Sequence, residues 1–334
     1  MEFKDCIEEI KQYGRFIDTY IDQNIKGEIE PLWSAARHYI TKGGKRMRPF
    51  LVLKTVELIK NIKIEESMKD LISIASAVEI LHNFTLIHDD IMDKDEFRRG
   101  IPTVHIKWDE NTAILAGDLL FALMFLIVSK SSIKDSIKNE INERLATVSK
   151  ELCEGQIMDI QFEHQESVSE QEYIQMISLK TAALLKTCIE IGTIYAEASE
   201  EQKLILKNYA YNLGIAFQLI DDILGLIGNE KELGKPIGSD IRQSKRTILY
   251  IKAIELLETP KKNELKAIFD KKQKTEDQIR YAIELIIKSG ALDYAKNLSE
   301  FYIQRSIKAI DQFPQSPTKE LFVSIAQFTL ERKF

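Results

Sequence analysis

Helix-breaking residues are rare along this chain. Its 334 residues include only 7 prolines and 14 glycines, and apolar side chains recur almost throughout at the three- and four-residue spacing of an amphipathic helix. The apolar–polar alternation of a half-buried strand is hard to find. The pattern predicts helices over residues 3–23, 29–41, 46–60, 66–92, 110–130, 133–162, 169–198, 200–225, 240–257, 260–271, 275–289, 291–311 and 317–332. We therefore expect an all-α fold, a bundle of roughly 10–13 helices with no sheet of consequence.

Linker signals are missing as well. The chain contains no Ser/Pro-rich tract, no low-complexity tract and no repeat, so we predict a single domain over residues 1–334, although the length alone permits two. The formal net charge of −6 argues against a general nucleic-acid binder. The charged first residues contain no apolar stretch of the kind found in a secretory signal.

The cysteines and the most apolar stretch bear on where the protein acts. Cys6, Cys153 and Cys188 are far apart and odd in number. They match neither a metal-site spacing nor a disulfide framework, and they fit a reducing cytoplasm. The segment from Leu119 to Val128 is about half the length needed to span a bilayer. We therefore predict a buried core helix there and no transmembrane segment.

A first group of acids ends a mostly apolar segment, LHNFTLIHDDIMD, which runs from Leu81 to Asp93. On a helix Asp89 and Asp93 are four residues apart and share one face, with Asp90 beside them. Clustered acids ordinarily form a solvated helix surface, but these apolar neighbours indicate a helix buried around most of its circumference. Carboxylates in such surroundings repel one another and are costly to desolvate. A bound Mg²⁺ would remove that conflict, because it prefers hard oxygen ligands.

The pattern occurs again in GIAFQLIDDILGLIG, residues 214–228. Here Asp221 and Asp222 lie in another apolar helical segment, and Gln218 precedes them by one turn on the same side. Two such groups in two largely buried helices are hard to explain as surface. Together they predict a cavity with acids on facing walls, which is a common way to build a metal site in a helical bundle.

Basic residues follow each acid group. Arg98 and Arg99 come after the first, and Lys235, Lys245 and Arg246 come after the second. Carboxylates, Mg²⁺ and basic side chains together suit a diphosphate, since the metal neutralises the phosphates and arginine forks onto their oxygens. The alternative is that these bases only pair with the nearby acids.

A third basic group lies in TKGGKRMRPF, residues 41–50. The two glycines end one predicted helix, and Lys45, Arg46 and Arg48 begin the next. A helix start adds backbone donors and the positive end of a dipole, so this turn favours an anion. An ordinary solvated turn is the alternative.

Taken in order, these motifs resemble those of the trans-isoprenyl diphosphate synthases, or polyprenyl synthetases. The set comprises GGKRMRP, DDIMD, RRGIPTVH, the triplet Lys180-Thr181-Ala182, FQLIDDILG, GKPIGSD and KRT, and it covers about residues 25–255. Each motif alone is modest evidence, whereas the ordered set is highly specific. The resemblance implies the isoprenoid synthase fold around a central substrate cavity, a cytoplasmic homodimer, and about two to three Mg²⁺ ions per active site.

The resemblance also implies a role for each matching residue. The residues that would bind the diphosphate of isopentenyl diphosphate are Lys45, Arg48, His82 and Arg99. Those that would bind the allylic diphosphate are Arg98, Lys180, Thr181, Gln218, Lys235 and Lys245. The metal ligands would be Asp89, Asp93 and Asp221. The set expected to act in catalysis comprises Asp89, Asp90, Asp93, Asp221, Asp222, Lys180 and Lys235. His82 precedes Asp89 by two helical turns, about 10 Å along the axis, which suits two adjacent diphosphates.

The implied reaction condenses isopentenyl diphosphate with dimethylallyl, geranyl or farnesyl diphosphate. The allylic C–O bond ionises, the double bond of isopentenyl diphosphate attacks the cation, and a proton leaves. Such catalysis consists of positioning and of electrostatic stabilisation of the leaving group. One departure from the family pattern is Gly225, which stands where the second motif carries a third aspartate. We expect metal binding to survive on Asp221 and Asp222, with the role of the third carboxylate unfilled.

In this family, product length depends on residues just before the first acid group. Phe84 lies five positions before Asp89, Thr85 lies four before it and Leu81 eight before it. One aromatic residue at the fifth position, with a small residue beside it, resembles the archaeal-type short-chain geranylgeranyl diphosphate synthases. We therefore expect Phe84 to form the floor of a product tunnel. Phe84 as ordinary core is the alternative.

Four other functions share parts of this pattern. A farnesyl diphosphate synthase differs in product length and favours aromatic residues at both positions. A terpene cyclase needs no isopentenyl site, and its second motif is an Asn/Asp, Ser/Thr and Glu triplet in which Gly225 would take the middle place. A non-catalytic subunit of a heteromeric synthase would lose acids or bases, and nearly all are intact. A di-iron carboxylate bundle would use Glu79 and His82 as its Glu-x-x-His element, but no second copy is found.

Overall fold

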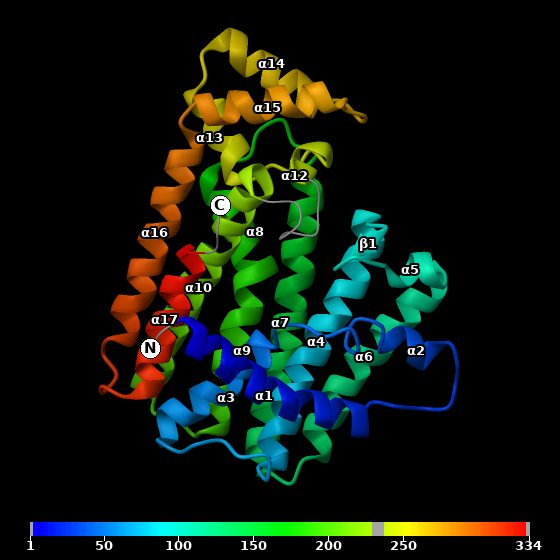
Figure 1. The fold of residues 1–334 in the computed structure, drawn as a ribbon, viewed down its shortest axis with the longest axis vertical. Coiled ribbons are helices and arrows are strands. Elements are labelled where there is room, and N and C mark those ends of the chain that lie inside the picture. Colours follow the sequence, from blue (N-terminus) through cyan, green and yellow to red (C-terminus); the bar gives the residue numbers. More distant parts are fainter. Residues whose placement is uncertain (1–2, 229–236, 332–334) are drawn as a thin grey trace. The chain divides into compact units, whose positions relative to one another are not determined.

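The computed structural model describes residues 3–228 and 237–331. Its helices are α1 (Phe3–Asn24), α2 (Leu32–Ala36), α3 (Met47–Lys60), α4 (Lys69–Asp93), α5 (Val104–Lys107), α6 (Glu110–Lys130), α7 (Asp135–Phe162), α8 (Glu170–Ile177), α9 (Ala183–Tyr195), α10 (Glu200–Ile227), α12 (Ser239–Arg242), α13 (Ile248–Leu256), α14 (Thr259–Phe269), α15 (Glu276–Lys288), α16 (Ala291–Ile310) and α17 (Pro317–Glu331) (Figure 1). A π-helical turn, η1 (Ser178–Ala182), joins α8 to α9. Two short strands, β1 (Phe97–Arg98) and β2 (Ile101–Pro102), form an antiparallel hairpin. The predicted all-α class is confirmed.

Three predicted helices are shortened or broken in the structure. The segment 29–41 holds only the short α2, followed by turns. The segment 169–198 holds α8, η1 and α9 instead of one regular helix. Within 240–257, Ser244 has a positive φ of 61° and separates α12 from α13, because a residue in that region cannot continue a right-handed helix.

The helix predicted to be wholly buried is only half buried. In α6, Phe121 and Leu126 are exposed, whereas Leu120 and Met124 are in the core. By length and composition α4, α6 and α10 could each cross a membrane. The apolar windows of α4 and α10 are 78% and 67% buried within the protein, but that of α6 is 39% buried. The exposed face of α6 is therefore the least covered of the three.

The chain forms two compact units. Unit 1 comprises Met1–Thr147, Thr187–Leu206 and Gln315–Leu321, and unit 2 comprises Val148–Lys186, Lys207–Pro314 and Phe322–Phe334. Each unit thus draws on separate stretches of the sequence. The single domain expected over residues 1–334 stays a prediction.

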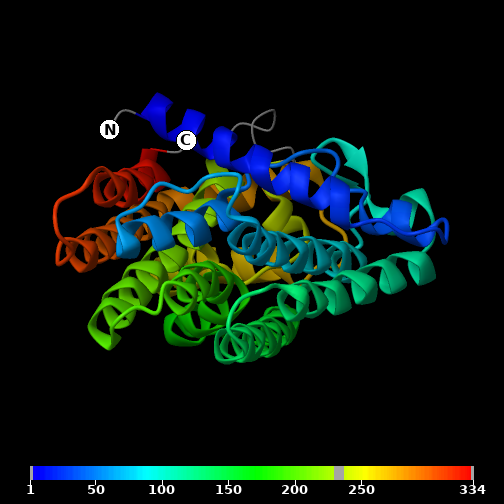
Figure 2. The same cartoon turned by 90° about the horizontal axis from the view of Figure 1, so that it is seen from below.

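In unit 1 the helices α4 and α6 run side by side (Figure 1). A Cβ on Gly117 would lie 2.1 Å from His88 Nε2, so this glycine lets the imidazole fit between the two helices. Figure 2 shows α1 running across α3 and α4. Tyr13 of α1 is buried there and donates a hydrogen bond to Glu57 of α3. These contacts hold the long helix that carries the first acid group.

In unit 2 two glycines make room for η1. A Cβ on Gly155 of α7 would lie 2.4 Å from the backbone nitrogen of Lys180, and a Cβ on Gly214 of α10 would lie 2.6 Å from Ala182 Cα. Both distances are too short for any real side chain. The close approach of α7 and α10 therefore fixes the π-helical turn that carries Lys180 and Thr181.

The substitution Gly155→Ala tests this packing. We expect it to destabilise the protein by about 1–3 kcal/mol, because the new methyl group meets backbone that cannot move aside. The midpoint of thermal unfolding, followed by circular dichroism, measures the effect. Cys153→Ala is the matched control, since Cys153 is exposed on the same helix. Equal melting of the two variants would contradict the close approach.

Candidate functional site

The first acid group lies at the end of α4, and its middle residue points inward. Asp90 is fully buried and accepts hydrogen bonds from the Tyr39 hydroxyl and, at 2.6 Å, from Arg98 Nε. Burial and the Asp90 carboxylate raise the pKa of Tyr39, so its hydroxyl stays a donor. Asp90 is thus a fixed acid, whereas Asp89 and Asp93, one helical turn apart, are only half buried.

Arg98 and Arg99 are neighbours in sequence but have different partners. Arg98 pairs with Asp90, with Nη2 2.6 Å from the carboxylate, as simple acid–base pairing predicts. Arg99 has a positive φ of 52° in the hairpin turn between β1 and β2, and its Nη1 donates to Gly43 O at 2.8 Å. Within the described chain Arg99 forms no ion pair with a carboxylate. The alternative that these bases only pair with nearby acids therefore accounts for the contacts of Arg98 but not for those of Arg99.

Arg48 of α3 and His82 of α4 form the second part of this basic group. Arg48 Nη1 lies 3.1 Å from His82 Nε2, which accepts, because a guanidinium can only donate. Burial, together with Arg48 and Arg99, holds the pKa of His82 well below its usual range, so the imidazole is neutral. Arg48 Nε is buried and has no hydrogen-bond partner among the described residues. A buried donor beside further positive charge suits an anion.

Arg46, two residues before Arg48, has a structural role. It is buried, forms ion pairs at 2.8 Å with Asp18 and with Glu79, and donates to Ile40 O at 2.6 Å. Its neighbour Lys45 is exposed. The basic turn therefore divides into one arginine that ties unit 1 together and side chains that are more accessible to a ligand.

The second acid group, in α10, repeats the arrangement of the first. Asp222 is buried and accepts hydrogen bonds from the Tyr173 hydroxyl and, at 2.9 Å, from Gln218 Nε2. Gln218 Oε1 in turn accepts from Thr181 Oγ1 at 2.7 Å. Asp221 is half buried. Three residues predicted from the sequence, Thr181, Gln218 and Asp222, are thus joined by direct hydrogen bonds.

Asp222 is also close to other acids. Burial and the carboxylate of Asp240, from α12, raise the pKa of Asp222 well above its usual range, and Asp221 adds to this effect. The hydrogen bonds from Tyr173 and Gln218 oppose the shift without cancelling it. Carboxylates that repel one another in a buried place are stabilised by a cation.

Two of the predicted lysines of unit 2, Lys180 and Lys245, share an acid that the sequence did not single out. Asp159 Oδ2 of α7 lies 2.5 Å from Lys180 Nζ and 3.0 Å from Lys245 Nζ, and Lys245 also pairs with Glu163 at 2.9 Å. Burial opposes ionisation of Asp159, but the two ammonium groups outweigh burial and lower its pKa. Asp159 follows Gly155 by one helical turn, and that spacing is the only signal that could have identified it.

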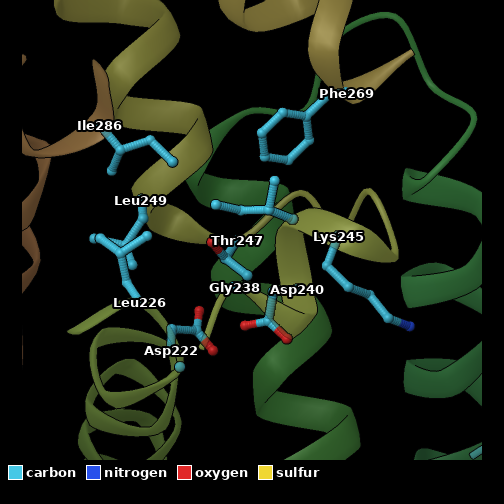
Figure 3. Close-up of a pocket in the computed structure, with 11 residues that line it drawn as sticks. Asp222, Leu226, Gly238, Asp240, Lys245, Thr247, Leu249, Phe269 and Ile286 are labelled. Atoms are coloured by element: carbon cyan, nitrogen blue, oxygen red, sulfur yellow. The ribbon is translucent and has the colours of Figure 1, made fainter. Parts of the chain in front are cut away.

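A small pocket opens beside the second acid group (Figure 3). Asp222, Gly225, Asp240 and Lys245 line its polar side, and the space admits about one water-sized molecule. Asp240 lies within the quoted GKPIGSD motif but was not predicted as a site residue. Lys235, from the same motif, lies outside the described residues.

The donor set fits Mg²⁺ bound together with a diphosphate. Among the described residues, no three His, Cys, Asp or Glu side chains converge to form a metal cage on their own. Mg²⁺ needs no such cage, since it usually takes one or two carboxylates together with substrate phosphate oxygens and water. Asp89 and Asp93 of α4, and Asp221 of α10, have the right chemistry for those contacts.

The residues expected to set product length lie along α4. Phe84 is half buried, with its ring centroid 5.2 Å from that of Phe121 of α6 and 4.9 Å from that of His88. Thr85 Oγ1 donates to His82 O at 2.8 Å, so its small side chain turns back onto its own helix. Leu81 is fully buried. Phe84 therefore belongs to an aromatic cluster between α4 and α6 and is not a fully enclosed core residue.

Comparison with known proteins gives these groups a context. The model of the polyprenyl synthetase family matches residues 30–286. A short chain isoprenyl diphosphate synthase from Methanocaldococcus jannaschii is 44% identical over 84% of this chain and 81% of its own. A geranylgeranyl diphosphate synthase from Saccharolobus solfataricus is 43% identical over 95% of both chains.

The fold agrees with the sequence match. The crystal structure of a geranylgeranyl pyrophosphate synthetase from Pyrococcus horikoshii superposes with a TM-score of 0.90 at 38% identity, and the match covers 100% of both chains. The resemblance inferred from the ordered motifs is confirmed by these matches. Sequence, fold and the placement of acids and bases lead to one conclusion: the chain belongs to the polyprenyl synthetase family.

Proposed function

We propose that this chain is a Mg²⁺-dependent prenyltransferase that condenses isopentenyl diphosphate with an allylic diphosphate, with geranylgeranyl diphosphate as its main product. The observation that carries the proposal is the basic group of Arg48, His82 and Arg99. It has a buried donor without a partner, and within the described chain neither arginine pairs with a carboxylate. The diphosphate of isopentenyl diphosphate, helped by the exposed Lys45, supplies the missing negative charge.

The allylic diphosphate is assigned to the acids and to the lysines of unit 2. Polyprenyl synthetases use Mg²⁺, and Asp89, Asp93 and Asp221 are the ligands we propose for about two to three ions. Asp90 and Asp222, held by hydrogen bonds, keep their neighbours in place.

Basic and polar side chains complete the proposed allylic site. They are Arg98, Lys180, Thr181, Gln218, Lys235 and Lys245. Asp159 holds the ammonium groups of Lys180 and Lys245, and each ammonium group has three N–H donors, so it can donate to a phosphate oxygen as well. Asp159 is thus a positioning residue for both.

Catalysis under this proposal is the stabilisation of a leaving group. The allylic C–O bond breaks, and the diphosphate departs with both electrons. The double bond of isopentenyl diphosphate then attacks the allylic cation to form a C–C bond, and a proton is lost to restore a double bond. Bound Mg²⁺ supplies Lewis-acid stabilisation of the departing diphosphate, and the protein supplies orientation and fixed positive charge.

The alternatives are less well supported. A terpene cyclase has no need for the Arg48, His82 and Arg99 group. A di-iron bundle would need Glu79 and His82 as ligands, but Glu79 pairs with Arg46, and His82 accepts from Arg48. A non-catalytic subunit has no use for acids and bases as complete as these. A farnesyl diphosphate synthase differs only in product, which is decided by experiment.

Incubation with Mg²⁺, labelled isopentenyl diphosphate and each allylic primer in turn tests the function. We expect the purified chain alone to form labelled geranylgeranyl diphosphate, and chelation of Mg²⁺ to abolish the reaction.

Asp89→Asn should lower kcat by about 10²–10³-fold, through loss of charge at the leaving group. Asp277→Asn is the matched control, because that acid lies on the exposed surface of α15. Failure to elongate any primer would overturn the proposal.

Phe84→Ala tests the tunnel floor. Removing the ring opens the aromatic cluster of Phe84, Phe121 and His88, so we expect the main product to gain at least one isoprene unit. Chromatography of the alcohols released from the products measures their length. Phe301→Ala, which removes an exposed ring on α16, serves as control and should leave the product unchanged. An unchanged product from Phe84→Ala would show that Phe84 only packs α4 against α6 and does not limit product length.

We also propose that the protein is a cytoplasmic homodimer. Its three cysteines are free thiols, as a reducing compartment keeps them. The exposed apolar side chains on α6 include Ile114, Leu115, Phe121 and Leu126. An exposed apolar face of this kind is typical of a subunit interface.

Charge placed on that face tests the dimer. Leu115→Glu combined with Leu126→Glu should convert the protein to a monomer, because buried charges cost several kcal/mol without partners. Sedimentation velocity measures the mass. Leu256→Glu, at an equally exposed leucine of α13, should leave the mass unaltered. A dimer that survives the double substitution excludes α6 as the interface.

A further inference from the structure

Arg46 lies among the residues assigned to isopentenyl diphosphate but is not itself placed to bind a ligand. Its side chain is buried, and each of its three nitrogens has an acceptor within the protein. Nε donates to Asp18 and Nη1 donates to Glu79, both at 2.8 Å. Nη2 donates to Ile40 O at 2.6 Å. A guanidinium that is buried and bonded in this way is out of reach of a diphosphate, so Arg46 can act on the ligand only through its neighbours.

The first helix approaches Arg46 closely. Gly14 and Asp18 are one turn apart and share a face of α1, which runs across α3 and α4 (Figure 2). A Cβ on Gly14 would lie 3.3 Å from Arg46 Cγ, so the glycine leaves room for the arginine stem, and Asp18 pairs with its Nε. The match to the family model begins at residue 30. The contact with Arg46 is therefore made by a helix outside that match.

Two contacts determine how the start of α3 meets α4. Glu79 and His82 are three residues apart on one face of α4, and Arg46 and Arg48 are two residues apart at the start of α3. Arg46 forms a buried ion pair with Glu79, whereas Arg48 contacts the neutral imidazole of His82. Opposite charges attract strongly where water is excluded. The pair of Arg46 and Glu79 therefore fixes the place at which Arg48 lies beside His82.

Arg46 also holds the turn that contacts Arg99. Arg46 has a positive φ of 48°, and its side chain reaches back to Ile40 O, so the residues between them form a closed turn. Gly43 O accepts a hydrogen bond from Arg99 Nη1 at 2.8 Å. A Cβ on Gly44 would lie 3.1 Å from Arg46 Nη1 and 3.1 Å from Arg99 Nη1. The turn thus lies between two guanidinium groups, of which Arg46 is the one paired with acids in the described chain.

We propose that Arg46 is a positioning residue for isopentenyl diphosphate. Its two acids, Glu79 and Asp18 of α1, hold it in place. Through the start of α3 and the turn before it, Arg46 in turn fixes Arg48 and Arg99. This inference rests on the proposed function. Because the two acids neutralise Arg46, its contribution to the site is orientation and not charge.

Arg46→Met combined with Glu79→Gln tests this role, since it removes the ion pair without changing the net charge. Apolar groups of similar volume often replace a buried ion pair without loss of stability. We expect the KM for isopentenyl diphosphate to rise about 10-fold or more, because small displacements of binding groups are costly. The kcat and the KM for farnesyl diphosphate should change by less than about threefold. Calorimetric titration with isopentenyl diphosphate alone should show the same loss of affinity.

Lys54→Met combined with Glu57→Gln is the matched control. Lys54 and Glu57 form another buried ion pair on α3, and Lys54 also pairs with Glu9 of α1. The control therefore removes the same kind of contact between α1 and α3, away from the turn that holds Arg99. Its KM for isopentenyl diphosphate should stay within about threefold of the parent value.

Arg46→Lys tests the geometry with the charge retained. One ammonium group cannot reproduce the planar fork that reaches Asp18, Glu79 and Ile40 O together. We therefore expect a smaller rise in the KM for isopentenyl diphosphate, about 3- to 10-fold. This variant keeps Glu79 paired, so it provides the test if circular dichroism shows that the double variant does not fold.

The outcomes separate the inference from the function on which it rests. If the parent chain neither binds nor consumes isopentenyl diphosphate, the proposed function itself fails. If the parent does so and the folded Arg46 variants keep its KM, only the positioning role is overturned. An equal rise in the KM of the Lys54 and Glu57 control would also overturn that role, because the effect would then come from the general packing of α1 on α3.

Discussion

A carboxylate buried inside a helical protein needs hydrogen-bond donors, and the arrangement of the site depends on which side chains supply them. Tyr39 donates to Asp90, and Tyr173 donates to Asp222. A hydrogen bond to a charged group contributes about 1.5–3 kcal/mol, and an unpaired buried carboxylate costs more than that. Each tyrosine therefore fixes how its partner helix is rotated. Since consecutive residues are about 100° apart around a helix, fixing the inner acid also fixes Asp89 or Asp221 on the less buried face.

The basic residues differ in whether the protein already neutralises them. Arg46 and Arg98 are paired with buried acids, so they stabilise the fold around the site. Lys180 and Lys245 both pair with Asp159, so this one carboxylate neutralises only part of their positive charge. Arg48 and Arg99 contact a neutral imidazole and a carbonyl oxygen. Of these six described side chains, the two that no carboxylate neutralises therefore lie in unit 1, at residues assigned to isopentenyl diphosphate.

Sequence periodicity was sufficient to predict the fold class, and the apolar residues around the acids were sufficient to identify both acid groups. The sequence alone was not sufficient to predict the roles of residues whose partners are distant in the chain. Arg98 and Arg99 are adjacent in the sequence, but in the structure Arg98 pairs with Asp90, whereas Arg99, which has a positive φ, donates to Gly43 O. Asp159 lies in the long helix α7, where only Gly155, one turn before it, marks the position. Its importance comes from two lysines that are 21 and 86 residues away. Helix periodicity predicted α8 to α9 as continuous, because a π-helical turn leaves the apolar pattern almost unchanged.

Gly225 departs from the family motif, and an acid from another element, Asp240 of α12, lies beside it. A motif assigns a role to a position, but a metal ion or a phosphate responds only to the oxygen atoms around it. A Cβ on Gly225 would lie 3.2 Å from Asp240 Oδ2, so the carboxylate of Asp240 is next to the place where a side chain at position 225 would begin. An acid on α12 is placed by the backbone bonds at Gly238 and Lys245 and not by the rigid helix that carries Asp221.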